Sequence, residues 1–350
     1  RELLLKWLVI NENMEIVFYN PDYETQWTEF LKLFTPDRDA SYFEWKYKRP
    51  CGNIQSSLML LKEKSKIVGC ISSLGDYAWV HNKKITIRSL VDYYAGEEHR
   101  RDGYGLKMLR DYLSRFPDKV FVAFGPNSQS GPIFKMLGWR PVTDVFKRYY
   151  FPVDIPYAVN AKTRFRIPTK VQLLVKPLLS LYVQLRKMAA KGDKTFKVYE
   201  DVDSFFLDKR VYQLWAERTR NVNIDFVSSI TKEHFEIYRS GSTGSKVIFL
   251  AVFNKKEEPI SACIIYIRDG VHAEIVEYAG DLGYLKYLFL IALDNVIRNY
   301  GKVLAIITST VEHEKILDSL LFQRGSDITA YFYSRDPVLR EKLGQLKSFS

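Results

Sequence analysis

The fold is decided by one stretch, residues 91–106, which reads Val91-Asp92-Tyr93-Tyr94-Ala95-Gly96-Glu97-Glu98-His99-Arg100-Arg101-Asp102-Gly103-Tyr104-Gly105-Leu106. A strand pattern ends here, and a loop with the pattern Arg-x-x-Gly-x-Gly opens a helix. Gly103 and Gly105 let the backbone approach a ligand, because they have no Cβ atom. The free N–H groups of the first helical turn then favour an anion, most naturally a pyrophosphate, and Arg100 and Arg101 add positive charge.

Two other phosphate-binding loops do not fit this spacing. A P-loop needs Gly-Lys-Ser/Thr after a longer loop, and Lys107 is not placed for that. A dinucleotide-binding fold needs Gly-x-Gly-x-x-Gly early in a βαβ unit, which is absent. Taken alone, the short glycine pattern also fits a turn before an ordinary helix, so its meaning depends on the elements around it.

Around this stretch, a run of strands precedes alternating strands and helices. The expected strands are 15–19, 58–61, 67–72, 76–81, 84–95, 119–124 and 140–151, and the expected helices are 21–34, 106–116 and 127–137. This order predicts an α/β fold of the mixed α+β kind, in which helices cover both faces of one mixed sheet.

The second half of the chain repeats this order of elements. Strands are expected at 196–199, 247–253, 261–267, 273–278, 303–308 and 328–333, and helices at 204–219, 225–239, 284–300 and 312–323. We therefore expect two similar domains, 14–153 and 196–337, joined by a segment at 154–195. The equivalent loop of the second domain, 278–283, has lost the Arg-x-x-Gly-x-Gly pattern, which indicates a degenerate copy.

Positive charge is concentrated in the joining segment. The net charge is +11, and residues 155–199 hold ten basic residues against one acidic residue. An anionic substrate or an anionic membrane surface could meet residues 162–197, and a solvated linker helix would have the same composition. No specific nucleic acid partner is expected.

Composition excludes several classes of protein. A content of 47% hydrophobic and 15% aromatic residues excludes a disordered chain, and no apolar run is long enough to span a membrane. The three cysteines form no C-x-x-C pair, which argues against a disulfide scaffold and against a zinc site, so no metal is expected. The reducing cytoplasm is the simplest location for such a chain.

The first half resembles the GNAT superfamily of acyl-CoA-dependent N-acyltransferases. Arg100, Gly103 and Gly105 match the family's loop pattern, and Asn127 and Gly138-Trp139 match its second part. The resemblance implies an acetyl-CoA site. Its loop amides, from Arg101 through Asp102, Gly103, Tyr104 and Gly105 to Leu106, would hold the pyrophosphate. Tyr93, Tyr94 and Ala95 would run along the pantetheine, and Asn127 would contact the cofactor.

One departure from the family concerns the general acid. Many members have a Tyr four residues before the glycine of the Gly-aromatic pair, and this chain has Phe134 there, which would line the cofactor without donating a proton. Tyr93, Tyr94 or Tyr104 could take over that role, and we name Tyr94 as the candidate. For the base that takes the amine proton, Asp92, Glu97 and Glu98 lie near the expected thioester end, and Asp92 is the candidate. Trp45 and Tyr47 fall where related enzymes line the acceptor cleft, or are core residues.

These observations lead to one main hypothesis and two alternatives. The main hypothesis is direct transfer of an acetyl or other acyl group from CoA to a primary amine of a small-molecule acceptor. One alternative is an aminoacyl-tRNA-dependent transferase that grips its donor through residues 162–197. The other is a non-catalytic acyl-CoA-binding or scaffold protein. The sequence does not specify the acceptor, a ligand of the second domain or the oligomeric state.

Overall fold

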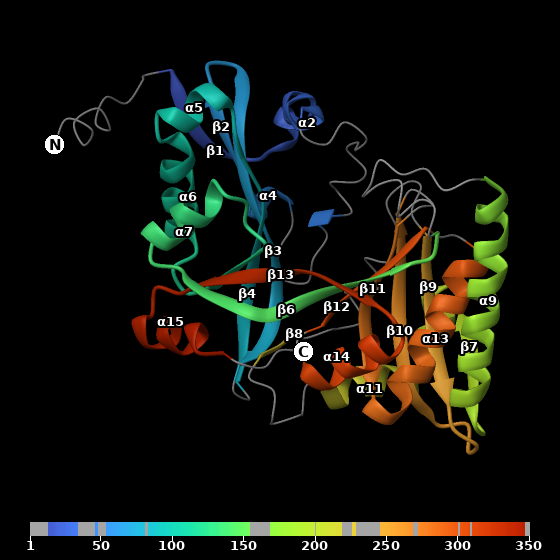
Figure 1. Ribbon diagram of the computed structural model, residues 1–350. Helices are drawn as coiled ribbons and strands as arrows, with labels where there is room; N and C mark the ends of the chain where they lie inside the picture. Colours follow the sequence, from blue (N-terminus) through green and yellow to red (C-terminus); the bar gives the residue numbers. More distant parts are fainter. Residues whose placement is uncertain are drawn as a thin grey trace. The chain divides into compact units, whose positions relative to one another are not determined.

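A computed structural model describes residues 13–33, 46–47, 54–80, 83–154, 169–199, 201–218, 226–228, 246–268, 272–299, 302–308 and 310–346 (Figure 1). The chain divides into two compact units, each made of two pieces. Unit 1 comprises Arg1–Val142 and Thr329–Leu346, and unit 2 comprises Thr143–Ile328 and Lys347–Ser350. The sequence led us to expect two continuous domains, 14–153 and 196–337. In the structure, unit 1 also contains Thr329–Leu346, and unit 2 begins at Thr143.

Unit 1 is built on a mixed sheet. Its strands follow the order β1 (Met14–Phe18), β2 (Leu58–Glu63), β3 (Lys66–Val80), β4 (Lys83–Ala95), β5 (Val120–Phe124) and the second part of β13 (Gln323–Tyr333). β4 and β5 are parallel, and the other neighbours in this unit are antiparallel. Its helices are η1 (Pro21–Tyr23), α2 (Glu24–Lys32), α4 (Ile54–Ser57), α5 (Glu97–Arg101), α6 (Tyr104–Arg115), α7 (Ser130–Met136) and α15 (Pro337–Gly344).

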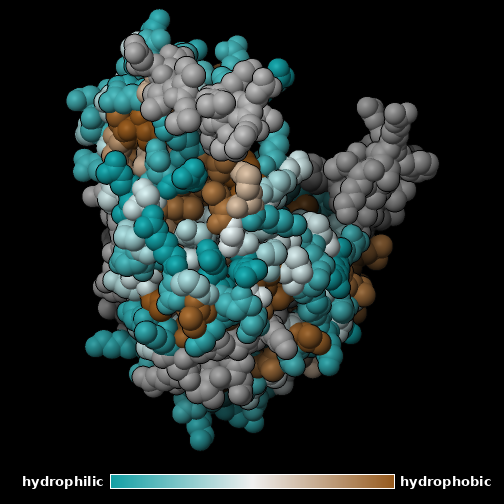
Figure 2. All heavy atoms as spheres, turned by 90° about the vertical axis from the view of Figure 1, so that its left-hand side faces the viewer, coloured by the Kyte–Doolittle hydropathy of each residue, from teal (hydrophilic) through white to brown (hydrophobic). Residues whose placement is uncertain are grey.

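Apolar side chains form a core on each face of this sheet. On one face, Met108, Leu109 and Tyr112 of α6 and Phe134 of α7 pack against the sheet. On the other face, α2 packs its buried residues, Trp27, Phe30 and Leu31. Successive strand residues point to opposite faces, so one sheet supplies both cores. The predicted mixed sheet with helices on both faces is thus confirmed for unit 1. Figure 2 views the side on which α6 and α7 lie, where apolar side chains gather in patches among hydrophilic ones.

The strands of unit 2 also run in mixed directions. The strands follow the order β6 (Arg140–Pro152), β12 (Val303–Thr308), β11 (His272–Gly280), β10 (Pro259–Arg268), β9 (Lys246–Phe253) and β7 (Thr195–Tyr199), and β11 and β12 are parallel. The helices are α9 (Thr169–Lys191), α10 (Val202–Leu207), α11 (Lys209–Arg218), α13 (Leu282–Asn299) and α14 (Val311–Ser319). The segment 226–228 is a short strand, β8 (Phe226–Ser228), where a helix was predicted; the rest of that prediction, from 229 to 239, lies outside the described residues.

The closing strand of each half pairs differently from the prediction. We expected 140–151 to close the first half and 328–333 to close the second. In the structure, β6 pairs with β12, from Lys147 opposite Thr308 to Pro152 opposite Val303. β13 pairs with β5, from Ala330 opposite Phe124 to Tyr333 opposite Phe121. Alternation of apolar residues shows that a segment is a strand, but it does not say which neighbour the strand will join.

Two further properties concern the described part of the chain only. None of its helices has the length and apolarity needed to cross a bilayer. Its histidine, cysteine and carboxylate side chains nowhere gather in a group of three or more that could hold a metal ion.

Candidate functional site

The site begins at a β-bulge in β4. Cys70 of β3 lies opposite Tyr94, and Ser72 lies opposite Val91, so a single β3 residue faces both Asp92 and Tyr93. Asp92 has φ 46°, a left-handed conformation that is rare for a residue with a Cβ atom. The extra residue shifts the alternation of side chains along the strand. Tyr93 therefore packs with the α6 core, while Tyr94 packs with the α2 core.

The parallel strands β4 and β5 separate before the bulge. They pair only from Ile87 opposite Val120 to Ser89 opposite Val122, whereas β4 stays paired with β3 as far as Ala95. The second edge of β4 after Ser89 therefore has no ladder partner among the described strands. Such an edge offers backbone N–H and C=O groups to an extended ligand, as an added strand would be bound.

The glycine loop lies directly after this edge. Gly96 donates its N–H to the Val68 carbonyl (2.8 Å), the short helix α5 follows, and Gly103 turns the chain with φ 78°. A residue with a Cβ atom is strained in that conformation, which explains the glycine. The helix predicted to start at Leu106 begins earlier, as α6, at Tyr104. Lys107 donates to the Gly103 carbonyl (3.1 Å), so the amides of Tyr104, Gly105 and Leu106 precede the helical ladder and remain available to an anion.

Gly105 and Tyr93 meet at this helix start. A Cβ atom on Gly105 would lie 3.2 Å from the Tyr93 hydroxyl oxygen, so glycine makes room for the tyrosine. The Tyr93 hydroxyl is buried and has no hydrogen-bond partner within the described part of the chain. Burial raises the pKa of Tyr93 to about 12. An unpaired buried hydroxyl is costly without a partner, so its place beside free helix amides fits a polar ligand such as the CoA arm.

The arginines of the motif lie in different environments. Arg100 donates from Nε to the Ala95 carbonyl (2.7 Å) and from Nη1 to Gln129 Oε1 (3.2 Å), so it fixes the strand end to the segment before α7. Arg101 is 83% exposed and lies 3.8 Å from Glu97, which leaves it accessible to a phosphate. Asp102 is exposed at the end of α5, and the ring of Tyr104 meets His99 edge-on.

Asn127 and Phe134 have structural partners of their own. Asn127 Oδ1 accepts from the backbone N–H groups of Gln129 (3.0 Å) and Ser130 (2.8 Å), and so caps the start of α7. A contact between Asn127 and a cofactor would use the amide nitrogen. Phe134 is 2% exposed, and its ring stacks on Trp139 (4.7 Å between centroids) and on Tyr93 (6.3 Å). Phe134 is thus part of the α6 core.

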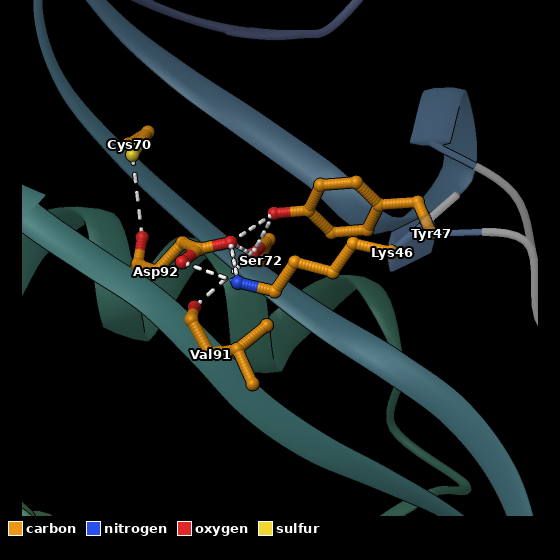
Figure 3. A network of polar contacts seen from close by, with 6 residues as sticks. All are labelled: Lys46, Tyr47, Cys70, Ser72, Val91 and Asp92. Carbon is orange, nitrogen blue, oxygen red and sulfur yellow. Dashed lines mark hydrogen bonds and ion pairs between the residues drawn. The ribbon is translucent and has the colours of Figure 1, made fainter. Parts of the chain in front are cut away.

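Asp92 lies at the centre of a polar network on the α2 side of the sheet (Figure 3). Its carboxylate is 8% exposed and accepts from Lys46 Nζ at 2.7 Å through both oxygens. The Tyr47 hydroxyl lies 2.5 Å from Asp92 Oδ2 and 2.6 Å from Ser72 Oγ. Ser72 donates to the Val91 carbonyl (3.1 Å), and the Cys70 thiol donates to the Asp92 carbonyl (3.2 Å). The network ties the short helical turn at 46–47 to the bulge.

Burial dominates the acid–base properties of this network. The pKa of Tyr47 is raised well above its ordinary value, first by burial and then by the negative charge of Asp92. Burial and Asp92 together raise the pKa of the Cys70 thiol as well, so this thiol is no nucleophile at neutral pH. Lys46 and Ser72 were not singled out from the sequence. Lys46 lies 46 residues and Ser72 lies 20 residues before Asp92 in the sequence. Among the residues singled out from the sequence, the candidate Tyr47, next to Lys46, was the only one that pointed to this region. Trp45 lies outside the described residues.

In unit 2, the start of α13, which follows the loop at 278–283, is occupied by the protein itself. Asp281 precedes α13, and its Oδ1 accepts from the Gly283 N–H at 2.8 Å. Gly280 approaches β10 so closely that a Cβ atom would lie 2.5 Å from the Ile260 carbonyl oxygen. Beside the divergence of β11 and β12, the Tyr278 hydroxyl contacts His313 Nδ1 (2.8 Å) and Thr308 Oγ1 (3.2 Å). A carboxylate at the first-turn amides repels a diphosphate.

Comparisons with known proteins give matches of structure but not of sequence. No protein-family model matches the chain, and a search of curated proteins finds no match. N-myristoyltransferase from Saccharomyces cerevisiae, solved with bound myristoyl-CoA, is similar with a TM-score of 0.64 at 14% identity, covering 93% of this chain and 84% of that one. A GCN5-related N-acetyltransferase from Anabaena variabilis is similar with a TM-score of 0.61 at 11% identity, covering 93% and 74%.

Identities this low establish the fold alone. Both similar structures cover 93% of the chain, so the likeness extends over its two units and is not confined to the loop region. The resemblance stated from Arg100, Gly103, Gly105 and Asn127 is confirmed at this level. The chain has the GNAT fold, the fold of the N-myristoyltransferase and of the GCN5-related N-acetyltransferase that it matches.

Proposed function

We propose that this protein is an acyltransferase that moves an acyl group from CoA to an amine, with the donor bound in unit 1. The observation that carries the proposal is the conjunction of an open β4 edge, three free helix amides after the left-handed Gly103, and the unpartnered Tyr93 hydroxyl. The likeness to an N-myristoyltransferase solved with myristoyl-CoA supports an acyl-CoA donor in the same fold. The acyl group and the acceptor stay open; acetyl transfer to a small amine is the simplest case.

The start of α6 and the open edge of β4 bind different parts of the donor. The amides of Tyr104, Gly105 and Leu106 hold the diphosphate, and the exposed Arg101 adds charge to it. Tyr93, Tyr94 and Ala95 bind the pantetheine arm along the open edge, although the Ala95 carbonyl already accepts from Arg100. Acyl-CoA, when bound, would supply an activated thioester.

The chemistry is a direct attack by the amine. Backbone N–H groups at the open edge of β4 stabilise the negative charge that develops on the carbonyl oxygen. Asp92 is the candidate base, and Tyr47 and Lys46 hold its carboxylate in place at the bulge. Phe134 has no proton to give, and Tyr93, stacked on it, brings a hydroxyl from the neighbouring strand. With a pKa of about 12, Tyr93 stays protonated at neutral pH and acts as a hydrogen-bond donor to the leaving thiolate. Tyr94, the candidate from the sequence, lies with the α2 core.

A second function is favoured by one observation. Both oxygens of Asp92 are bound by Lys46, so Asp92 must first release the Lys46 ammonium group before it can act as a base. A chain that binds acyl-CoA without transferring it would keep this ion pair intact. The two functions share the donor site and differ only in turnover.

Calorimetric titration with acetyl-CoA, myristoyl-CoA and free CoA tests the donor site, and release of CoA thiol with a panel of amines tests turnover. Micromolar binding with thiol release supports the transferase, and binding without release of thiol by any amine supports the second function. Absence of binding by all three CoA compounds would refute both. Gly192→Ala is the matched control for Gly103→Ala, because both glycines have positive φ (52° and 78°) and only Gly103 lies in the loop. If Gly103→Ala loses CoA binding and Gly192→Ala keeps it, the binding site is assigned to the loop.

A further inference from the structure

Helix α9 of unit 2 is apolar on two opposite faces. One face packs into the core through Leu179, Tyr182, Val183 and Ala190, next to α13. The polar side chains of Gln184 and Lys187 bind Asp294 of α13, which is buried and also accepts from Arg298. These contacts fix which side of α9 faces inward. In Figure 1 the helix lies on the outside of unit 2, beside β7.

The opposite face carries a row of exposed apolar side chains, which we call the leucine row. Its members are Leu178 (64% exposed), Leu181 (55%), Leu185 (53%) and Met188 (61%). The steps of three, four and three residues place them on one stripe of a helix, about 100° per residue around the axis. At that spacing, the centre of the stripe lies nearly opposite the packed face. A contiguous exposed row of large apolar residues indicates contact with another body.

The surroundings of the leucine row are strongly basic. Between Lys176 and Tyr199 there are six basic residues and one acidic residue. The acidic residue, Asp193, is already paired with Lys255 (3.0 Å). Lys176 and Lys191, which flank the leucine row in the sequence, are exposed. A partner that binds this surface must therefore carry both negative charge and an apolar region.

The edge strand β7 extends this surface. Phe196 and Val198 pair with Val252 and Leu250, whose side chains belong to the same core as α9 and α13. Because paired residues share a face of the sheet, Phe196 and Val198 lie on the α9 side. They are 43% and 39% exposed, and Lys187 Nζ lies 5.9 Å from the Phe196 ring centre.

We infer that α9 and β7 form a docking surface for an anionic phospholipid bilayer. The leucine row enters the boundary between headgroups and acyl chains, and the lysines beside it pair with lipid phosphates. A second copy of this chain is a poorer occupant, because two such faces would bring their exposed lysines together, and the nearby acidic residue, Asp193, is already paired with Lys255. A nucleic acid would pair with the lysines but would leave four exposed aliphatic side chains without a role. The inference is independent of the acyltransferase proposal.

Sedimentation of the full chain with vesicles tests this surface. We expect binding to vesicles of phosphatidylcholine mixed with phosphatidylserine, and little binding to phosphatidylcholine alone. Leu181→Ser combined with Leu185→Ser should weaken binding at least about tenfold, because two inserted side chains are lost. Lys176→Gln combined with Lys191→Gln should weaken it about 25-fold, at roughly fivefold for each charge. Val338→Ser in α15 is the matched control, since Val338 is also 64% exposed but lies in unit 1.

Each outcome decides for or against the inference. Equal unfolding temperatures of all variants would show that the substitutions leave the fold intact, as their exposure implies. Binding that depends on both the leucines and the lysines supports a bilayer surface. Binding that survives the leucine substitutions and disappears with added salt would overturn it in favour of a purely electrostatic contact. Absence of vesicle binding, or a dimer in light scattering that the leucine substitutions dissociate, would overturn it as well.

Discussion

The carboxylate of Asp92 and the ammonium group of Lys46 form a largely buried ion pair, with 2.7 Å between Lys46 Nζ and each Asp92 oxygen. The pair joins the bulge of β4 to a residue 46 positions earlier in the chain. Tyr47 adds a hydroxyl 2.5 Å from the same carboxylate. The candidate base is thus fixed in position, and its charge is balanced by the protein before any substrate arrives.

Removing the cation of this pair should cost more stability than neutralising the carboxylate. Lys46→Met leaves a carboxylate 8% exposed without its cation, and we expect a loss of about 2–4 kcal/mol in the free energy of unfolding. Asp92→Asn should lose less, because the amide keeps hydrogen bonds, and should lower the transfer rate at least about a hundredfold if Asp92 is the base. Urea unfolding and thiol release measure the two effects. An Asp92→Asn variant with full activity would remove Asp92 from the mechanism.

Tyr93→Phe separates stability from function. The hydroxyl has no partner in the described structure, so its removal should leave the protein equally stable or more stable by about 1 kcal/mol. If the hydroxyl contacts the donor, the same substitution should weaken acyl-CoA binding or slow thiol release about tenfold. Tyr112→Phe is the contrasting control. The Tyr112 hydroxyl contacts Ser73 (2.6 Å) and Ser57 (2.7 Å), so its loss should destabilise the fold. A strong destabilisation by Tyr93→Phe would contradict the assignment.

Gly105→Ala should weaken donor binding, because the new methyl group would lie 3.2 Å from the Tyr93 hydroxyl and would displace it. Combining it with Tyr93→Phe removes the oxygen that the methyl group meets. We therefore expect the double variant to recover stability relative to Gly105→Ala alone, by about 0.5–1 kcal/mol. Thermal unfolding of the four proteins in this cycle measures the coupling. Strictly additive effects would show that the two groups do not touch.

Stability should fall at alkaline pH. Burial raises the pKa of Tyr93 and of Tyr112 to about 12, above the ordinary value of 10.0. The folded state therefore holds these protons when the unfolded state has lost them, so the stability they contribute is complete below pH 10.0 and declines between pH 10.0 and about 12. The slope should be about 1.4 kcal/mol per pH unit for each tyrosine. Urea unfolding across this range checks it, and Tyr93→Phe should reduce the slope by one tyrosine. An unchanged slope in the Tyr93→Phe variant would show that the pKa of Tyr93 lies near its ordinary value.

One CoA molecule should bind per chain. The start of α13 in unit 2 is capped by the Asp281 carboxylate, whereas the first amides of α6 in unit 1 precede the helical ladder, so we expect the diphosphate to bind at α6. Asp281→Ala should lower stability by about 1 kcal/mol, as the loss of a helix cap does, and should leave CoA affinity unchanged. Titration calorimetry gives the stoichiometry and affinity together. Two molecules per chain would show that unit 2 has kept a working site.

Much of the donor site follows from local sequence. A glycine at 103 is required by a left-handed turn, the helix after it exposes amides, and both follow from adjacent residues. The Asp281 cap could also have been found, because Asp directly before a helix is a common N-cap. Other parts of the site could not be predicted from neighbouring residues. Phe134 was expected beside the cofactor, and its burial between Tyr93 and Trp139 depends on strands and helices meeting in three dimensions.

Interactions between residues close in sequence set most of the element types and their order, the mixed sheet and the position of the glycine loop, and so these could be predicted. Only the tertiary structure decided that β13 closes unit 1 and β6 closes unit 2, that Lys46 neutralises Asp92, and that α9 keeps its leucine row outside. An alternating strand can join any edge with a matching face, and an ion pair can join any two charges that the fold brings together. Those choices are made by the packing of the whole chain.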